Sequence, residues 1–314
     1  MFCLLPFTEL LLTSEGTARI CCEAWMPTSI GNVLTTPIKD IWNGPIAQKI
    51  RLSIIDQSFS YCTKCPFLFS KLSSPTKHVN KPFQIKQLRL AYDPTCNLTC
   101  PSCRKTPIGP SNFPVPNTSQ ITHDALLESG ILKDITYLGM AGYGDPFASS
   151  LYWQLLLDIP RINPKVAIHL HTNGLLLSPE KWNELGKTTQ QITGITISVD
   201  ASCGTTYRIN RKSSWSQLLN NIKFAASLVK KLQLNFVIQN NNFREMPDFV
   251  TMAWKYGASN VFFEPIGNWT NLSQTEYELQ AVHLPSHPRH TEFLKILNSP
   301  IMQDPRITLA WQHG

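Results

Sequence analysis

The sequence predicts an α/β protein in which a partial (β/α)6 barrel follows a small cysteine-rich domain that contains a β-hairpin. Strand-like and helix-like segments alternate from residue 84 onward. Most cysteines lie in short groups in the first third of the chain, and a polar, proline-bearing stretch at 73–82 separates two of these groups. We therefore expect a cysteine-rich domain at 1–75, a linker at 76–82, the barrel at 83–270 and a C-terminal capping extension at 271–314.

Six segments have the residue pattern of strands, and the first alternates apolar and polar residues as a half-buried strand does. They are 84–92, 135–140, 166–171, 195–199, 232–238 and 260–264. Right-handed crossovers curl such βα units into a parallel barrel or part of one. Active residues then gather at the C-terminal ends of the strands.

The helical segments between these strands have clear signals. Ser178 is a predicted helix N-cap because Pro179 follows it at the first helical position. Residues 215–231 have a strongly amphipathic pattern, and further helices are expected over 245–256 and 291–297.

The composition is that of an ordinary soluble globular protein, with 42% hydrophobic and 16% charged residues among 314. No apolar stretch is long enough for a membrane span, and residues 1–12 lack the basic start of a signal peptide, so we expect a cytoplasmic location. The cysteine groups favour metal ligation in a reducing compartment over disulfides. The net charge of +7 is compatible with an acidic partner. No basic run interleaved with aromatic residues predicts nucleic-acid binding.

Cys96, Cys100 and Cys103 form a Cys-x3-Cys-x2-Cys motif just after the first predicted strand. Three thiolates hold a 4Fe-4S cluster with one iron left open, and that iron can bind a substrate or cofactor. A structural zinc site is the alternative, but zinc needs a fourth ligand and is usually held by Cys-x2-Cys pairs. The motif and its position after a strand together favour the cluster.

This motif resembles that of the radical S-adenosylmethionine (SAM) family. The resemblance implies that the open iron binds the amino and carboxylate groups of SAM. It also implies that an electron from the reduced cluster cleaves SAM to a 5′-deoxyadenosyl radical. The chain departs from the family at Ser102, where relatives usually have an aromatic or large apolar residue near the adenine. Phe263 is a candidate replacement, although burial in the barrel core is a simpler role for it.

Other strand ends also resemble the family's SAM-binding segments. Residues 139–146 resemble its Gly-Gly-Glu-Pro stretch, which implies that Gly142, Gly144 and Asp145 help to bind SAM; an ordinary glycine-rich turn is the alternative. The stretch 171–174 is also frequent in the family. Ser198 and Asp200 end the fourth strand, where relatives place polar groups near the carboxylate and ribose of SAM. Asn235 on the fifth strand is a further candidate for cofactor binding.

The N-terminal region holds a second cysteine pattern, and two predicted strands at 7–12 and 18–22 would form a hairpin that brings distant cysteines together. Cys3, Gly16 and Cys21 resemble the Cys-x(9 to 15)-Gly-x4-Cys opening of the auxiliary-cluster modules called SPASM and twitch domains. The resemblance implies a second 4Fe-4S cluster on Cys3, Cys21, Cys62 and Cys65, with Cys22 left over. A four-cysteine zinc knuckle is the alternative.

Together these resemblances imply a radical SAM oxidoreductase that removes a hydrogen atom from a peptide or natural-product intermediate. The auxiliary cluster would accept an electron or anchor the substrate, and flavodoxin or ferredoxin would supply electrons. The alternatives are dehydrogenation of a sugar-like or nucleotide-linked molecule, a glycyl-radical activase, and a non-catalytic iron-sulfur or zinc protein. The sequence assigns no catalytic residue for the substrate step. It also leaves open the roles of Cys203, His283, His287 and His290.

Overall fold

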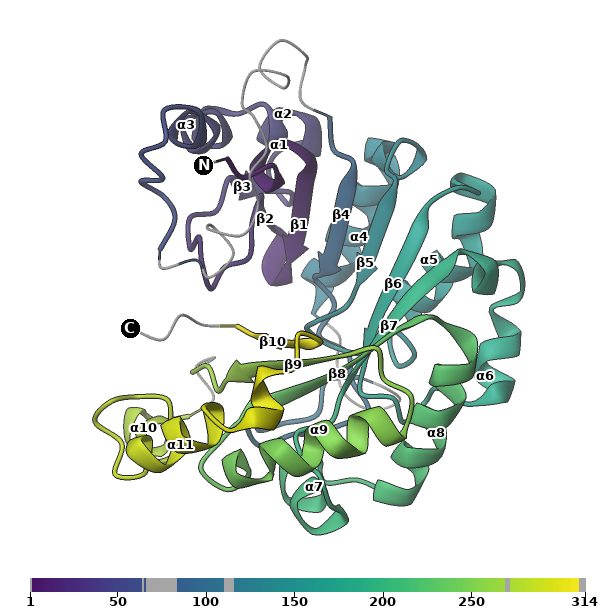
Figure 1. The fold of residues 1–314 in the computed structure, drawn as a ribbon. Helices are drawn as coiled ribbons and strands as arrows, with labels where there is room; N and C mark the ends of the chain where they lie inside the picture. The colour runs from purple at the N-terminus through teal and green to yellow at the C-terminus, as the bar shows by residue number, and fades with distance from the viewer. Residues whose placement is uncertain (1, 64, 66–83, 110–115, 269–271, 311–314) are drawn as a thin grey trace.

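The computed structural model describes residues 2–63, 65, 84–109, 116–268 and 272–310. One curved sheet runs through the protein, with its ten strands in the order β10-β9-β8-β7-β6-β5-β4-β1-β2-β3. The strands β3 and β10 lie at its two edges, so the barrel remains open (Figure 1). The expected linker at 76–82 lies outside the described residues.

Six parallel strands form the centre of the sheet and pair in chain order. They are β4 (Gln87–Ala91), β5 (Tyr137–Met140), β6 (Ala167–Thr172), β7 (Ile192–Ser198), β8 (Lys231–Ile238) and β9 (Asn260–Pro265). Each overlaps one of the six predicted segments. The predicted partial barrel of six βα units is therefore confirmed.

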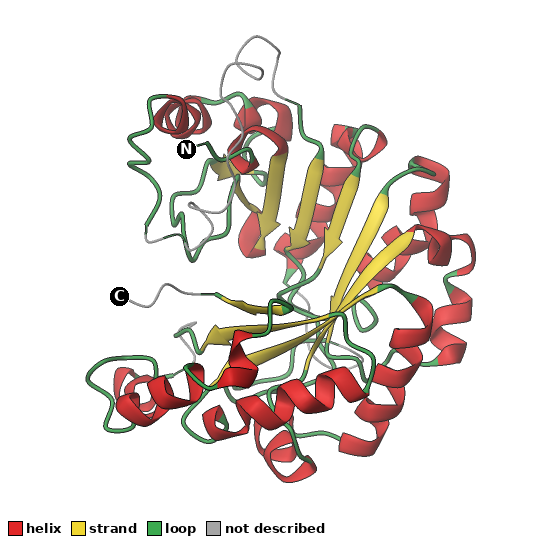
Figure 2. Ribbon diagram, in the orientation of Figure 1, coloured by secondary structure: helices red, strands yellow, loops and turns green. Residues whose placement is uncertain are grey.

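Helices cover the outer face of this sheet (Figure 2). They are α4 (Asn117–Ser129), α5 (Ser150–Ile162), α6 (Pro179–Glu184), α7 (Gly204–Arg211), α8 (Trp215–Leu228) and α9 (Met246–Lys255), with the 3₁₀ turns η3 (Ile131–Lys133), η4 (Gly186–Gln191) and η5 (Phe243–Glu245) between them. Ser178 caps α6 as predicted, because its hydroxyl accepts a hydrogen bond from the backbone N–H of Lys181 at 3.2 Å.

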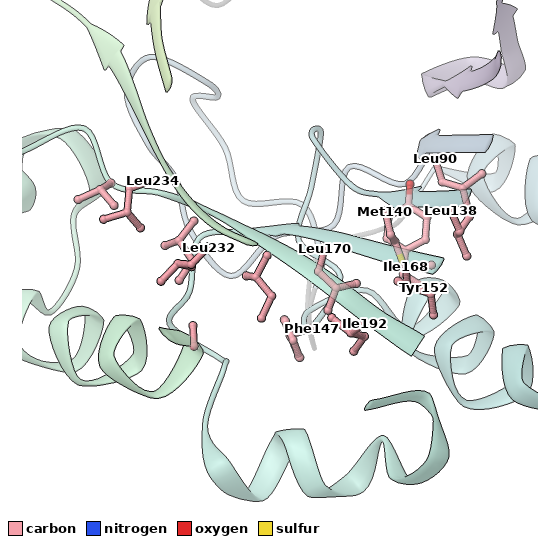
Figure 3. Packing of buried hydrophobic residues seen from close by; sticks show 14 of the residues in the cluster. Leu90, Leu138, Met140, Phe147, Tyr152, Ile168, Leu170, Ile192, Leu232 and Leu234 are labelled. Atoms are coloured by element: carbon pink, nitrogen blue, oxygen red, sulfur yellow. The ribbon is translucent and has the colours of Figure 1, made fainter. Parts of the chain in front are cut away.

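The core lies between the sheet and these helices (Figure 3). Leu138, Leu170 and Leu234 are fully buried there, each from a different strand. Successive strand residues point to opposite faces, so the inner face of the same strands carries half-buried polar side chains such as His169 and Glu264. A one-residue slip would exchange the two faces, and burial of the core therefore fixes which polar side chains face the barrel interior.

The N-terminal region extends this sheet. Strand β1 (Glu9–Thr13) pairs in parallel with β4 and turns through η1 (Ser14–Gly16) into the antiparallel strands β2 (Thr17–Arg19) and β3 (Gly31–Asn32). Helices α1 (Leu5–Thr8), α2 (Ile38–Trp42) and α3 (Pro45–Ile55) complete the region. The predicted hairpin is thus confirmed. An ion pair between Glu9 and Arg89, with the oxygen and nitrogen 2.8 Å apart, joins β1 to β4.

The C-terminal extension runs through α10 (Gln274–Gln280), α11 (His290–Leu297) and η6 (Pro300–Gln303) into β10 (Ile307–Leu309), which pairs in parallel with β9. A ring nitrogen of His287 lies 3.2 Å from the carbonyl oxygen of Leu279, and one of His290 lies 3.0 Å from that of Val282. These contacts are local to the extension. Among the described residues, no helix is both long and apolar enough to cross a membrane.

Candidate iron-sulfur and cofactor site

One cavity lies at the C-terminal ends of β4, β5, β6 and β7, where a parallel barrel places its active residues. Its lining comprises Cys96, Leu98, Cys100, Cys103, Arg104, Gly142, Gly144, His171, Thr172, Asn173, Ser198 and Arg211. The three cysteines of the Cys-x3-Cys-x2-Cys motif therefore face the same space. Of the predicted cofactor residues, Gly142, Gly144 and Ser198 reach this cavity, whereas Asp145, Asp200 and Asn235 do not form part of its lining.

The cysteine loop is held at several points of its backbone. The N–H of Asp93 donates to the hydroxyl of Tyr152 at 2.8 Å, and the N–H of Cys96 donates to the carbonyl of Ile108 at 3.0 Å. The N–H of Asp145, from the loop after β5, donates to the carbonyl of Thr95 at 2.7 Å. These bonds fix the loop before any ligand binds, which favours a preformed site.

Each thiol of the motif accepts a hydrogen bond from one polar side chain, with a nitrogen-to-sulfur distance of 3.6 Å in every case. The pairs are Asn173 with Cys96, Arg211 with Cys100 and Arg104 with Cys103. Such bonds stabilise sulfur that carries negative charge, as a metal-bound thiolate does. The donors thus match the chemistry of a thiolate-ligated cluster.

Burial raises the pKa of the Cys96 thiol to about 11 and also raises that of Cys100, which the Arg211 guanidinium opposes. Without metal, both thiols are therefore protonated at neutral pH. Iron would have to displace these protons, so loading of the site should be favoured by higher pH.

Gly144 and Gly142 have different surroundings. A Cβ atom on Gly144 would lie 2.3 Å from the carbonyl oxygen of Asp93, at a φ of +94°. Gly144 is therefore needed for the close approach of its loop to the cysteine loop. A Cβ atom on Gly142 would lie 3.9 Å from the Nδ1 atom of His171. Gly142 is thus the glycine that leaves space open toward the cavity.

Asp145 is fully buried and lies behind the cavity wall. Its carboxylate accepts hydrogen bonds from the Thr172 hydroxyl at 2.7 Å and from the backbone N–H groups of Asn173 and Phe147 at 2.8 and 3.0 Å. Asp145 therefore joins the loops after β5 and β6. Its contacts are those of a residue that positions Asn173.

The end of β7 contributes a buried polar network. A ring nitrogen of His171 lies 2.9 Å from the Ser198 hydroxyl, and burial lowers the pKa of His171 to about 3, so that its ring is neutral. Asp200 pairs with Arg211, its Oδ2 atom lying 2.8 Å from Nη2 of the arginine. The Oδ1 atom of Asn235 accepts a hydrogen bond from the side chain of Gln233 at 2.7 Å. Asp200 and Asn235 thus lie deeper than Ser198.

The N-terminal cysteines also gather in one place. Cys3 and Cys62 pack against the same small apolar cluster, formed by Phe2, Phe7 and Ile54. Burial raises the pKa of Cys62 to about 11, and the nearby Cys3 and Cys65 add to the rise. The pKa of Cys21 is also raised. Burial is the largest cause, and Cys3 and Cys65 are among the nearby groups that add to it. Cys3 and Cys65 are therefore electrostatic neighbours of both Cys21 and Cys62.

Cys21 and Cys22 are distinguished by their neighbours. Burial raises the pKa of Cys22, and the charged groups that act on it are Glu264, Arg89 and Glu9. Two of these lie on the barrel strands β4 and β9. Cys22 thus interacts electrostatically with charged groups of the barrel, whereas Cys21 interacts with Cys3 and Cys65 as well as with Cys22 and Glu9.

The N-terminal region matches a known protein family. Residues 3–66 match the model of SPASM, an iron-sulfur cluster-binding domain. This match includes Cys3, Cys21, Cys62 and Cys65. The N-terminal module is therefore similar to a SPASM domain.

The described chain as a whole is similar to SuiB of Streptococcus suis. With SuiB bound to the precursor peptide SuiA, the TM-score is 0.53 at 13% identity, over 87% of this chain and 63% of SuiB. With SuiB bound to S-adenosylmethionine, the TM-score is 0.51 at 12% identity, with the same coverage. This likeness shows that the chain shares the fold of SuiB, and the chain spans less than two thirds of the SuiB chain. No curated protein sequence matches it.

Two buried hydrogen-bond donors near the Cys-x3-Cys-x2-Cys motif bear on whether an iron-sulfur cluster fits there. Among the described residues, the Nε atom of Arg211 and the hydroxyl of Tyr207 have no hydrogen-bond partner. Each of these two side chains interacts electrostatically with Cys100. The sulfur atoms of a cluster accept hydrogen bonds, and such bonds tune its potential. The donor set therefore fits a cluster at this position, although the described side chains include no group of three or more His, Cys, Asp or Glu placed to hold a single metal ion.

Some residues that line the cavity were not assigned from the sequence. Arg211 lies at the end of a short helix between the basic residues Arg208 and Lys212, and no motif singles it out. Arg104 directly follows the last cysteine of the motif, and this position could have indicated that it lines the cavity. The sequence placed Phe263 either near adenine or in the core. Its side chain is fully buried, with its ring 5.4 Å from that of Phe236 and 5.8 Å from that of Phe249, as a core residue requires.

Proposed function

We propose that the protein is a radical SAM enzyme that holds a 4Fe-4S cluster on Cys96, Cys100 and Cys103. The observation that carries this proposal is that three thiols, each with a hydrogen-bond donor, share one cavity at the strand ends of the barrel. When bound, the cluster supplies the electron that splits SAM, and the resulting 5′-deoxyadenosyl radical removes a substrate hydrogen atom.

Within this proposal, Gly142 and Ser198 are the wall residues that would contact SAM. Gly142 leaves open space beside His171, and Ser198 is held by the same histidine. His171 stays neutral because of its burial, so it adds no charge next to a cationic sulfonium. Asp145 and Asp200 would act indirectly, through Asn173 and Arg211.

The inner face of the barrel provides the space for a substrate. Its half-buried side chains include the polar His169 on β6 and Glu264 on β9, beside the apolar Phe262. A partly polar interior fits a substrate with several hydrogen-bonding groups, such as a peptide. SuiB, which has the same fold, binds a precursor peptide. We therefore propose a peptide or natural-product intermediate as substrate, and an oxidative outcome.

The SPASM module would hold the second 4Fe-4S cluster. Strand β1 of the module pairs with the barrel strand β4, and Arg89 and Glu264 of the barrel act electrostatically on Cys22, so the module adjoins the barrel. Such a position suits a cluster that takes an electron from a substrate radical or anchors the substrate. The grouping of the cysteines suits metal ligation better than disulfides, which supports a reducing compartment such as the cytoplasm, with flavodoxin or ferredoxin as electron donor.

The proposed function is tested by anaerobic reconstitution with iron and sulfide, followed by reduction in the presence of SAM. The protein should release 5′-deoxyadenosine and methionine in equal amounts even without substrate. A reconstituted, brown protein that leaves SAM intact would contradict the proposal. With the true substrate deuterated at the attacked carbon, one deuterium should appear in 5′-deoxyadenosine for each product formed.

A further inference from the structure

Two of the three side chains that donate to the motif thiols are arginines, and one of them is held in place by a buried carboxylate. We propose that Arg211 raises the reduction potential of the cluster on Cys96, Cys100 and Cys103 through its hydrogen bond to Cys100, and that Asp200 positions Arg211 for this. This inference rests on the proposed function, since it requires that the cluster forms.

Arg211 is rigidly placed. Its Nη1 atom lies 3.6 Å from the Cys100 sulfur and its Nη2 atom 2.8 Å from Oδ2 of Asp200, with side chains only 11% and 1% exposed. Asp200 is fixed in turn, because its Oδ1 atom accepts a hydrogen bond from the backbone N–H of Val237 at 2.7 Å. The guanidinium therefore cannot turn away from Cys100 without leaving a buried carboxylate unpaired.

Charge decides the direction of the effect. Reduction adds one negative charge to a cluster, so a cation bonded to a ligand sulfur stabilises the reduced form more than the oxidised form. Asp200 opposes this, but the Arg211 guanidinium lies between it and the sulfur. In a buried site of low effective dielectric constant the nearer charge has the larger effect. The potential should therefore be higher with Arg211 than without it.

Arg104 is a less suitable target for a test. One of its terminal nitrogens donates to the carbonyl of Pro94, and its guanidinium lies 5.4 Å from the ring centre of Tyr143. Arg104 thus also holds the cysteine loop together. Arg211 lies on α7, outside that loop, so its replacement changes the charge with less change in the loop itself.

The test is a potentiometric titration of the reconstituted full-length protein, followed by electron paramagnetic resonance in the absence of SAM. At the potential where the wild-type cluster is half reduced, Arg211→Gln should have a reduced-to-oxidised ratio about tenfold lower, which is about 59 mV for a one-electron couple. Arg211→Lys keeps the charge but not the forked geometry, and should shift in the same direction by less. Arg161→Gln, at an 83% exposed side chain, is the matched control and should show no shift.

A double variant tests the effect of the Asp200 charge by itself, because without Arg211 there is no side chain for Asp200 to position. The pair Arg211→Gln with Asp200→Asn removes both charges, and should recover part of the shift because no unpaired carboxylate remains near the cluster. An unchanged potential in both Arg211 variants, with full iron content, would overturn the inference. Weaker SAM binding by the Arg211 variants at an unchanged potential would also overturn the inference, and would assign Arg211 to cofactor binding. If the wild type binds no cluster, the proposed function itself fails.

Discussion

The carbonyl oxygen of Asp93 lies only 2.3 Å from the position that a Cβ atom on Gly144 would occupy. The loops after β4 and β5 thus touch backbone to backbone. This contact assigns the two glycines of the second loop to different tasks, since Gly144 supports the cysteine loop and Gly142 opens toward the cavity.

We therefore predict different losses for the two alanine variants. Gly144→Ala should displace the cysteine loop and lower the iron content of the reconstituted protein. Gly142→Ala should retain the iron and bind SAM more weakly, because the φ of +129° strains an alanine there and its methyl group enters the space beside His171. Iron analysis and calorimetric titration with SAM measure the two effects. Full iron content in Gly144→Ala would show that this contact is not required.

Asp145→Asn should destabilise the protein by about 1–3 kcal/mol, the cost of leaving a buried partner unsatisfied. The carboxylate accepts three hydrogen bonds from Thr172, Asn173 and Phe147, and an amide places N–H groups where an acceptor is needed. Chemical unfolding of the iron-free variant measures this. Unchanged stability combined with lost SAM affinity would mean that Asp145 contacts SAM itself.

Cys21→Ala and Cys22→Ala form a matched pair. We predict that Cys21→Ala loses about half of the iron, because it removes a ligand of the second cluster, whereas Cys22→Ala keeps all of it. Iron analysis after identical reconstitution provides the comparison. If Cys22→Ala lost the iron and Cys21→Ala kept it, Cys22 would be the ligand, and the cysteines would have to rearrange when the cluster binds.

The raised pKa of Glu264 predicts that the stability of the protein depends on pH. Burial, with a smaller contribution from Asp200, raises its pKa from 4.5 to about 7. The folded chain therefore holds this proton more tightly than the unfolded chain, and its contribution to stability is lost as pH rises from 4.5 through 7. Above pH 7, Glu264→Gln should be more stable than the wild type by up to about 3 kcal/mol.

This difference should vanish below pH 4.5, where both side chains are neutral. Denaturant unfolding of the iron-free proteins across this pH range measures it. A constant difference between the two proteins at every pH would show that Glu264 titrates normally.

The strands were predictable because a half-buried sheet imposes alternation on its sequence, and the cysteines because ligand spacing is local. The pairing of β1 with β4 was not, since these strands are far apart in the sequence and their pairing is a long-range choice. Arg211 and Asp200 illustrate the same limit in the site. Arg211 pairs with Asp200 nearby in the sequence, but its hydrogen bond to Cys100 joins segments that are distant along the chain. Nothing near Arg211 in the sequence marks it as a donor to a thiol.

The most direct test of the central claim replaces Cys96, Cys100 and Cys103 together by Ala. Because two separate thiolate sets are present, the wild type should hold two 4Fe-4S clusters, about eight irons per chain. The variant should retain about half of that iron, on the SPASM module, and should form no 5′-deoxyadenosine from SAM. Cys203→Ala, at an exposed cysteine outside the cavity lining, should behave as the wild type. Undiminished cleavage of SAM by the triple variant would contradict the account.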